Sequence, residues 1–349
     1  MEEEKWLQTD QYLNFHCKEG ACRNSCCEGW QIAVSMQDYF RVIGMECSEE
    51  LHRKLECAFR VPQMPSPERY RLISPNYLGK CPLHDESGLC MLHRDLGPQA
   101  LPEICRMYPR NLKQFGDERR ACCSNSCEAV IEDWMRDEPI RFSWGELDAA
   151  PECAVEASAA DLALGRECAA ILQREDMKLK DRLACACTRL SGKKYEVRAD
   201  QVQAGLWTLL DALRVEMENI SSLRRFGEDA LIRYGGENGA ALRRYREDIN
   251  CMESAFPAWE RWFENILLNH LFYENLPCAD ARLGAADVCH GLCLLYGAMR
   301  AFSAAYLIRH PSRADFADVL AGIFRAVEHS PFYYNARVLV EKPENLLAL

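Results

Sequence analysis

The sequence has little of what marks an exported or membrane-spanning chain. Its first ten residues, MEEEKWLQTD, contain three consecutive glutamates and lack the basic start and apolar stretch of a secretory signal. The longest apolar run, residues 285–308, is interrupted by Asp287, His290 and Arg300, which a membrane span tolerates poorly. We therefore expect a cytoplasmic protein with a buried helix over 285–308 and no membrane partner.

The sequence also lacks a basic stripe that would bind nucleic acid. Its 349 residues include 42 Lys and Arg against 53 Asp and Glu, for a formal net charge of −11, and most of that excess lies in residues 128–349. Because an acidic protein repels nucleic acid, we expect no such partner. The negative charge would attract a basic substrate such as a lysine side chain, although acidic residues are more commonly just solvated surface residues.

Cysteine is the residue type in excess. The chain has 20 cysteines, and thiols stay reduced in the cytosol, so we do not expect disulfides. Twelve lie in residues 1–127 and eight in residues 128–349. Most of the second group stand among alanines and leucines, which is typical of small apolar core residues. The first group needs a different explanation.

Residues 1–127 contain only short predicted elements. Helices are expected over 35–43 and over 48–59, the second with Ser48 as N-cap, and a short strand over 69–74. Short elements joined by long loops bury little apolar surface, so such a region usually needs disulfides or a bound metal to be stable. Because the cysteines are expected to be reduced, we expect a metal.

Residues 128–349 have long helical patterns and no recurring alternation of strand and helix, which argues against a doubly wound sheet. The expected helices cover residues 151–177, 199–219, 257–272, 280–309 and 315–328. We therefore predict a mainly α fold, with a cysteine-rich, loop-rich metal-binding region over 1–127 and an all-helical domain over 128–349.

The first cysteine run reads Cys17-x4-Cys22-x3-Cys26-Cys27. Thiolates are preferred ligands of zinc and of iron–sulfur clusters. The spacing of Cys22 and Cys26 would place both sulfurs on one face of a helical turn. The adjacent side chains of Cys26 and Cys27 diverge, which suits two metal ions, or two edges of one cluster, better than a single tetrahedral zinc.

Further cysteines stand in separate segments, namely Cys81, Cys90, Cys105, Cys122, Cys123 and Cys127. Such segments converge only through the fold, as in a metal site whose formation is coupled to folding. The alternative is a core of inert thiols, which the polar, turn-rich sequence around Cys81 and Cys90 disfavours. His84 and His93 repeat a Cys-x2-His spacing and could add zinc ligands, although such histidines are more often surface or supporting groups.

Several of these runs resemble the bacterial flagellin lysine-N-methylase family. They are Cys-x3-Cys-Cys-x-Gly-Trp at 22–30, Gly-x-Cys-Pro at 79–82, Cys-x-x-Tyr-Pro-Arg at 105–110, the segment 126–130, and Trp262, Glu264 and Asn265 with the following LLNHLFYENLP. The cysteine layout is also similar to that of CxxxCC-type zinc- or iron-chelating domains.

The resemblance implies methylation of flagellin lysines by S-adenosylmethionine, with a cysteine-ligated iron–sulfur cluster or, alternatively, zinc. Carried over by position, the metal ligands are Cys17, Cys22, Cys26, Cys27, Cys81, Cys90, Cys105 and Cys127. The family usually has Cys-Pro-Glu near the last group, whereas this chain has Cys127-Glu128 without the proline. Cys123 is therefore the alternative ligand there.

The family-like motifs also supply candidate catalytic residues. Tyr108, Glu264 and Asn265 lie in these motifs and could help an acceptor lysine to lose its proton. A tyrosine in such a position more commonly packs or caps a helix, and polar residues like Glu264 and Asn265 more commonly lie on a solvated helix face. The sequence lacks the glycine-rich strand-to-helix turn of nucleotide binding and the CxxxCxxC spacing of radical S-adenosylmethionine clusters, so it does not identify the residues that bind the donor.

Two functions of different classes follow. The first is an S-adenosylmethionine-dependent lysine N-methyltransferase that acts on flagellin. The alternative is a non-enzymatic zinc- or iron-chelating or redox protein whose helical part is a docking domain. A helical scaffold for flagellar assembly is a third, weaker interpretation.

Overall fold

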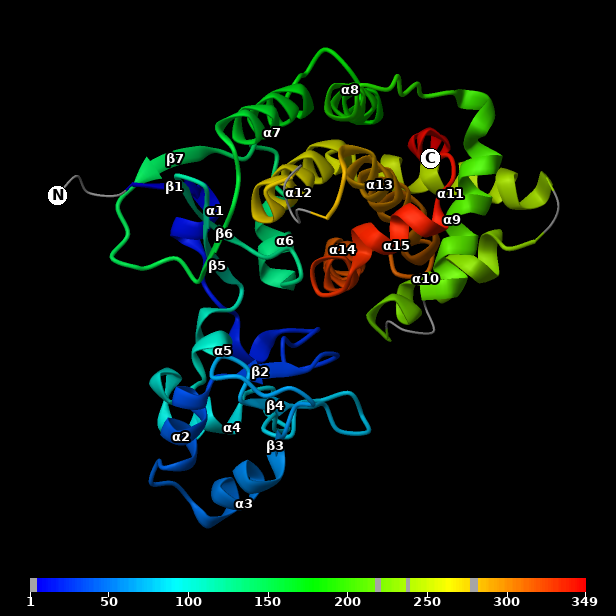
Figure 1. The fold of residues 1–349 in the computed structure, drawn as a ribbon. Helices are drawn as coiled ribbons and strands as arrows, with labels where there is room; N and C mark the ends of the chain where they lie inside the picture. The colour runs from blue at the N-terminus through cyan, green and yellow to red at the C-terminus, as the bar shows by residue number, and fades with distance from the viewer. Residues whose placement is uncertain (1–4, 217–220, 237–238, 277–281) are drawn as a thin grey trace. The chain divides into compact units, whose positions relative to one another are not determined.

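The structure is a computed structural model that describes residues 5–216, 221–236, 239–276 and 282–349 (Figure 1). The chain divides into two compact units. The first, which we call the cysteine-rich unit, is His16–Tyr108. The second, the helical unit, combines the residues up to Phe15 with Pro109–Leu349.

The cysteine-rich unit is built from short elements, as its sequence predicts. Its elements are β2 (Ile32–Val34), α2 (Met36–Ile43), α3 (Glu49–Ala58), β3 (Phe59–Arg60), β4 (Arg71–Ile73), α4 (Met91–Leu96) and α5 (Glu103–Met107), with short 3-10 turns at Glu19–Ala21 and Pro98–Ala100. The strands form an antiparallel sheet in the order β2-β4-β3. Ser35 and Ser48 cap α2 and α3 through their side chains, which confirms both predicted helices.

A five-stranded sheet stands at one end of the helical unit. Its strands are β1 (Trp6–Thr9), β5 (Arg110–Phe115), β6 (Glu118–Cys123), β7 (Phe142–Gly145) and β8 (Cys153–Val155), in the order β7-β1-β6-β5-β8. The β1 strand pairs in parallel with β6, so residues on both sides of the cysteine-rich unit belong to one sheet.

This sheet differs from the sequence prediction in two ways. The unit boundary lies at Tyr108 and not at residue 127, because β5 and β6 pair with the N-terminal strand. Residues 128–349 are also not entirely helical. The helix expected from Pro151 begins only at Ala159, because Cys153–Val155 pairs with Lys113–Phe115 of β5.

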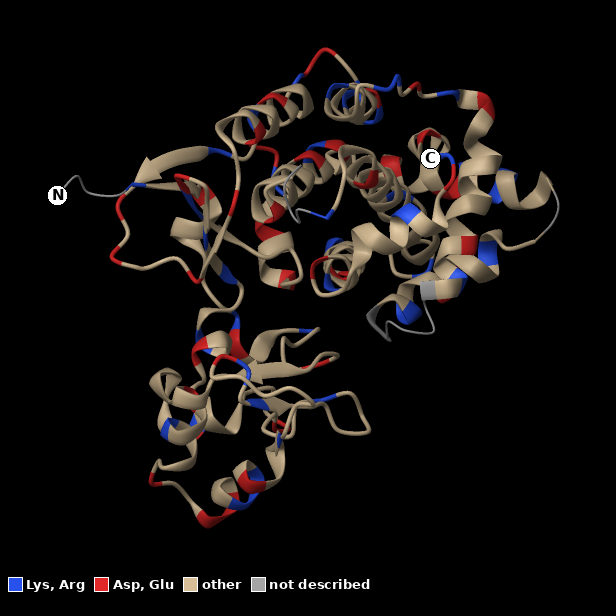
Figure 2. Cartoon of the chain, viewed as in Figure 1, with Lys and Arg blue, Asp and Glu red and all other residues tan. Residues whose placement is uncertain are grey.

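Helices make up the rest of the helical unit, and the fold is mainly α as predicted. They are α1 (Asp10–Asn14), α6 (Glu128–Trp134), α7 (Ala159–Leu172), α8 (Leu179–Ser191), α9 (Val202–Glu216), α10 (Ser221–Tyr234), α11 (Gly239–Ala255), α12 (Trp259–Glu274), α13 (Ala285–Leu307), α14 (Arg313–Glu328) and α15 (Phe332–Leu339), with 3-10 turns at Ala199–Gln201 and Pro343–Ala348. Figure 2 shows acidic and basic residues interspersed along these helices.

The long apolar helix α13 lies in the core of the helical unit. Among the described helices it alone is long and apolar enough to cross a membrane by length and composition, and 94% of that stretch is buried inside the protein. It packs against α8, α10, α11, α14 and α15. The interrupted apolar run is therefore a buried core helix, as predicted.

Candidate functional site

Two segments of the cysteine-rich unit pair side by side and bring Cys27 next to Cys81. The amide of Cys81 donates to the carbonyl of Cys27 (2.7 Å), and the amide of Gly29 donates to that of Gly79 (2.9 Å). Gly29 and Gly79 have φ values of 94° and 78°, a conformation that glycine adopts at little cost. The Cys27 sulfur accepts hydrogen bonds from the thiols of Cys26 and Cys81.

Cys90 and Cys105 approach the same place from α4 and α5. Residue 90 forms a β-bridge with His84 and stands at the N-terminus of α4. The charge of Cys27 acts on Cys81, Cys90 and Cys105, and burial raises the pKa of Cys90 to about 11. Five predicted ligands therefore converge within one unit.

The protonation states of these thiols suit metal binding. Hydrogen bonds from Cys26 and Cys81 lower the pKa of the Cys27 thiol, and the nearby imidazole of His84 lowers it further against the opposing effect of burial. The pKa of Cys81 is raised, by its hydrogen bond to Cys27 and by burial. One thiolate thus stands among neutral thiols, and the thiolate is the form that binds metals.

The other three predicted ligands are placed differently. Cys22 follows the short 3-10 turn Glu19–Ala21, and residues 22–29 contain no helix, so the helical turn expected to align Cys22 with Cys26 is absent. Cys17 is exposed, and its sulfur accepts from the amide of Glu19 (3.3 Å). Cys127 lies in the helical unit as the N-cap residue of α6.

The alternative ligand Cys123 is a core residue of the helical unit. It lies with Cys122 in β6, and both side chains are almost completely buried. Burial raises the pKa of Cys122 to about 12 and that of Cys123 well above its ordinary range. Both thiols are therefore neutral, as expected of packing residues.

The donor atoms that converge are cysteine sulfurs, which are the ligands that zinc and iron–sulfur clusters prefer. His84 adds to them an Nε2 atom that is buried and makes no hydrogen bond. Within the parts of the chain that the structure describes, however, no three His, Cys, Asp or Glu side chains have the mutual geometry of a metal site. Soft sulfur donors with one imidazole suit zinc or an iron–sulfur cluster. The side chains would have to move closer together to coordinate the metal.

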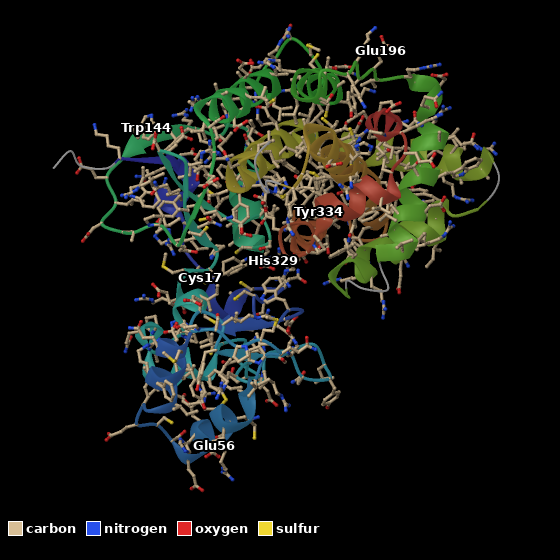
Figure 3. The ribbon with its side chains drawn as sticks, viewed as in Figure 1. Cys17, Glu56, Trp144, Glu196, His329 and Tyr334 are labelled. Atoms are coloured by element: carbon tan, nitrogen blue, oxygen red, sulfur yellow. The ribbon has the colours of Figure 1, made fainter. Side chains whose placement is uncertain are left out.

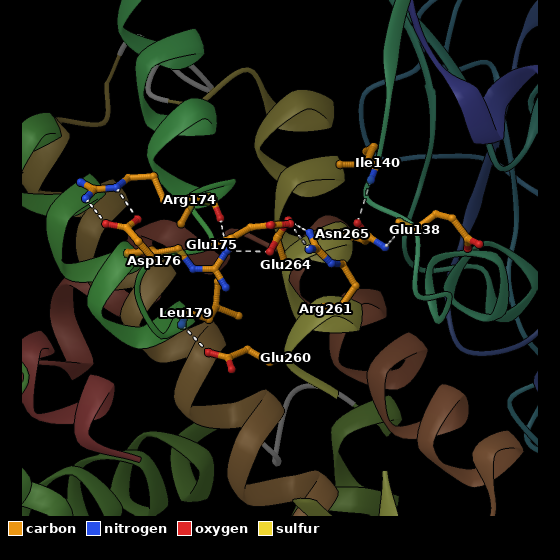
Figure 4. A network of polar contacts seen from close by, with 12 residues as sticks. Glu138, Ile140, Arg174, Glu175, Asp176, Leu179, Glu260, Arg261, Glu264 and Asn265 are labelled. Carbon is orange, nitrogen blue, oxygen red and sulfur yellow. Dashed lines mark hydrogen bonds and ion pairs between the residues drawn. The ribbon is translucent and has the colours of Figure 1, made fainter. Parts of the chain in front are cut away.

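The three predicted catalytic residues are divided between the two units. Tyr108 ends the cysteine-rich unit, and its ring is 5.9 Å from that of Trp30. Glu264 and Asn265 lie on α12 in the helical unit and are fully buried (Figure 4).

Glu264 and Asn265 hold α12 to its neighbours. Glu264 accepts from Arg182 of α8 (2.6 Å) and from Arg261. The Asn265 side chain accepts from the amide of Ile140 (2.8 Å), and its amide group donates to the carbonyls of Trp134 and Glu138. These contacts are those of structural groups, and a catalytic role for either residue stays a prediction.

A second polar cluster in the helical unit was not predicted as a site. Glu328, the last residue of α14, accepts hydrogen bonds from Ser124 (2.5 Å) and His270 (3.1 Å). The other ring nitrogen of His270 bonds Tyr333 (2.7 Å). No spacing pattern in the sequence links residues 124, 270 and 328.

Comparison with known proteins gives partial matches. The chain is 27% identical to the lysine-N-methylase of Salmonella choleraesuis (strain SC-B67) over 125 residues, which are 36% of this chain and 31% of that protein. The lysine-N-methylase of Salmonella typhimurium is 27% identical over 124 residues, 35% and 30% of the two chains. The flagellar biosynthetic protein FliU of Salmonella muenchen is 26% identical over 133 residues, 38% of this chain and 78% of that protein.

No family model and no solved structure matches the chain. The match spans about a third of the length of the two lysine-N-methylases. Over that third, this chain is similar to lysine-N-methylases and to a flagellar biosynthetic protein.

Proposed function

We propose that this protein is a lysine N-methyltransferase that acts on flagellin, with S-adenosylmethionine as the methyl donor and a cysteine-ligated metal in the cysteine-rich unit. The observation that carries the proposal is the similarity to two lysine-N-methylases and to FliU. The convergence of Cys26, Cys27, Cys81, Cys90 and Cys105 supports the metal.

These five cysteines would hold the metal, with His84 beside them. Cys17, Cys22 and Cys127 are further candidate ligands. An iron–sulfur cluster, when bound, would offer iron coordination to the donor's amino and carboxylate groups or carry an electron, whereas zinc would stabilise the fold.

The reaction requires a neutral lysine amine. An ε-ammonium has no lone pair, so it must lose a proton before its nitrogen can attack the methyl carbon of the sulfonium. The carbon–sulfur bond then breaks, and its electron pair stays on sulfur as the thioether product. The net charge of −11 favours the approach of a basic side chain.

The direct test is methyl transfer from donor carrying a labelled methyl group to purified flagellin, with protein purified anaerobically. We expect label on flagellin lysines, located by mass spectrometry. The Cys27→Ser variant should lose metal and activity together, whereas Cys57→Ser, at an exposed cysteine of α3, should keep both. Metal-replete wild-type protein that transfers no label would contradict the proposal.

One observation favours a second function. The converging thiols lie in a unit that is compact by itself, as expected of a chelating or redox module with a helical docking domain. Such a protein would bind metal stoichiometrically and transfer no methyl group. A brown protein with broad absorption near roughly 400 nm would indicate an iron–sulfur cluster, and a colourless protein with bound zinc a structural site.

A further inference from the structure

The strand β7 lies at one edge of the five-stranded sheet and pairs on one side only. In the sheet order β7-β1-β6-β5-β8 it is the first strand, and its partner is β1. Among the residues that the structure describes, no strand pairs with its other side. Figure 1 shows β7 beside β1 in this position. The outer side of β7 is therefore an open sheet edge.

The register with β1 determines which backbone groups of β7 point outward. The amide of Asp10 donates to the carbonyl of Arg141 (3.0 Å), so these two residues form a hydrogen-bonded pair of the antiparallel ladder. Because such pairs alternate with non-hydrogen-bonded pairs, Phe142 and Trp144 belong to the second kind. The amide and carbonyl groups of Phe142 and Trp144 therefore point away from β1, toward the open edge.

These outward backbone groups have no partners in the described part of the chain. The amides and carbonyls of Phe142 and Trp144 make no hydrogen bond with any other described residue. Edge strands are commonly protected against pairing by a lysine, a proline or a bulge, whereas β7, with the sequence Phe-Ser-Trp-Gly, contains neither lysine nor proline. Two amides and two carbonyls are thus available to an added strand, which suits a partner that binds and leaves.

Trp144 adds an exposed aromatic ring to this edge (Figure 3). Its side chain is 57% exposed and lies on the same face of the sheet as that of Phe142, whose ring centre is 4.9 Å from that of Phe272 of α12. A side chain of an added strand that stood opposite Trp144 would lie beside the indole. A lysine there would pack its methylene stem on the ring and hold its ammonium over the ring face, which is a favourable cation–π contact.

The segment around β7 is acidic. Residues 137–152 contain one basic residue, Arg141, and five acidic residues, namely Asp137, Glu138, Glu146, Asp148 and Glu152. All five are exposed, and the first four make no ion pair with a described lysine, arginine or histidine. Figure 2 shows acidic residues along the loop that follows β7. An open edge flanked by negative charge favours a basic segment.

We propose that the outer edge of β7 binds an extended, lysine-bearing segment of the acceptor protein as a sixth strand of the sheet, with a lysine side chain of that segment on the indole of Trp144. Added strands of this kind bind through main-chain hydrogen bonds, and their side-chain contacts give specificity. The inference rests on the proposed function and adds the surface that receives the protein substrate. It assigns no residue to the chemistry of methyl transfer.

The same charges disfavour the simplest competitor, which is a second copy of this chain. Two β7 edges that paired with each other would bring residues 137–152 of both copies together, with five acidic residues against one basic residue on each side. Like charges that face each other across a pair of strands are destabilising. A lysine-bearing strand replaces this repulsion with attraction.

The first test measures hydrogen exchange at the outward amide of Trp144 and needs no turnover. In protein that carries isotope-labelled tryptophan, the NMR signal of this amide is assigned from its loss in Trp144→Phe. The probe is a short synthetic peptide of alternating threonine and lysine, and its control has glutamate in place of lysine. We expect the lysine peptide to slow exchange at Trp144 roughly tenfold or more and the glutamate peptide to leave it unchanged.

Two results of this test would overturn the inference. One is unchanged exchange at Trp144 in millimolar lysine peptide. The other is slow exchange without peptide that depends on protein concentration, together with a dimer in sedimentation, because a second copy would then occupy the edge. The amide of Trp207 on α9 should not respond to either peptide, which controls for general stabilisation of the fold.

The second test compares the affinities of variants for dye-labelled flagellin monomer by fluorescence anisotropy. Trp144→Ala removes the ring but keeps the outward amide, and it should raise Kd roughly fivefold. Trp144→Pro also removes that amide, which does not pair with β1, and should raise Kd about fivefold further. Trp207→Ala, at a tryptophan that is 49% exposed, should leave Kd unchanged. Equal Kd values for wild-type protein and both Trp144 variants would refute the docking edge.

The charge of the edge is tested in the same assay. Glu146→Gln combined with Asp148→Asn should raise Kd roughly threefold at low ionic strength, and the effect should shrink in high salt. Glu247→Gln, at an exposed carboxylate of α11, is the matched control and should change nothing. Binding that depends on neither salt nor these two carboxylates would reject a lysine-bearing occupant.

These tests fail independently of the proposed function. Methyl transfer by the wild-type protein, with unchanged exchange at Trp144 and unchanged affinity of both Trp144 variants, would support the methyltransferase and reject the docking edge. Slowed exchange at Trp144 with the lysine peptide, without methyl transfer to flagellin, would support the edge and reject the methyltransferase.

Discussion

Replacing Glu264 by glutamine separates a structural from a catalytic role for this residue. Glu264 is 1% exposed and pairs with Arg182, itself 5% exposed, and with Arg261. The amide in Glu264→Gln keeps the shape of the side chain but removes its charge, so the buried guanidinium of Arg182 keeps only neutral acceptors, the new amide oxygen and the carbonyl of Leu172 (2.6 Å). Breaking a buried pair from one side costs about 3 kcal/mol or somewhat more in the free energy of unfolding.

The measurement is urea unfolding followed by far-ultraviolet circular dichroism, alongside methyl transfer by the same preparation. We expect a lower unfolding midpoint for Glu264→Gln, and activity that falls only as far as the folded fraction does. Asp176→Asn, in the exposed pair of Asp176 with Arg174 (Figure 4), is the matched control and should change stability little. Unchanged stability with abolished turnover would refute the structural reading and make Glu264 catalytic.

Three further predictions concern packing, metal and pH. A methyl group at Gly291 would lie 2.2 Å from the ring of Tyr333, so Gly291→Ala should cost about 1–3 kcal/mol of unfolding free energy in the same urea assay. Cys81→Ser should lose bound metal by elemental analysis and open residues 16–108 to proteolysis, whereas Cys57→Ser should do neither. His329 should titrate below roughly 6.5 by NMR, because its pKa is lowered. Its neutral form then stabilises the fold above that pH and this contribution is lost as the pH falls, so His329→Gln should flatten the acid side of the stability profile.

Local features of the fold could be predicted from the sequence, because they depend on neighbouring residues. Ser35 and Ser48 each cap a helix that begins at the next residue. The helical period over 199–219 corresponds to α9, and the apolar run over 285–308 to α13. In each case the signal and the structure it specifies lie within one element.

Features that depend on long-range pairing could not be predicted. The boundary at Tyr108 follows from the pairing of β1 with β6, whose partners Trp6 and Arg119 are more than a hundred residues apart. No local pattern at residues 6–9 reports that pairing. The expected helix from Pro151 failed for the same reason, because the parallel partner of β8 is β5.

The candidate site divides in the same way. The thiol-rich segments were visible in the sequence because cysteines are scarce in most chains and their spacing is a signal. The polar cluster around Glu328 gave none, because serine, histidine and glutamate are common, and only the fold brings Glu328 within hydrogen-bond distance of Ser124 and His270.

The contact between Phe15 and Arg110 holds together the two ends of the helical unit's interrupted sequence. The Arg110 guanidinium donates to the Phe15 carbonyl (3.1 Å) and lies over its ring, so the points where the chain leaves and re-enters the helical unit are neighbours. Residues 16–108 are thus an insertion in the sequence of the helical unit. A linker of a few glycines could join Phe15 to Pro109 in their place. A shortened version of this kind would keep the five-stranded sheet and the helices of the helical unit without any of the converging thiols. Recombination could likewise exchange residues 16–108 without changing the strand order of that sheet.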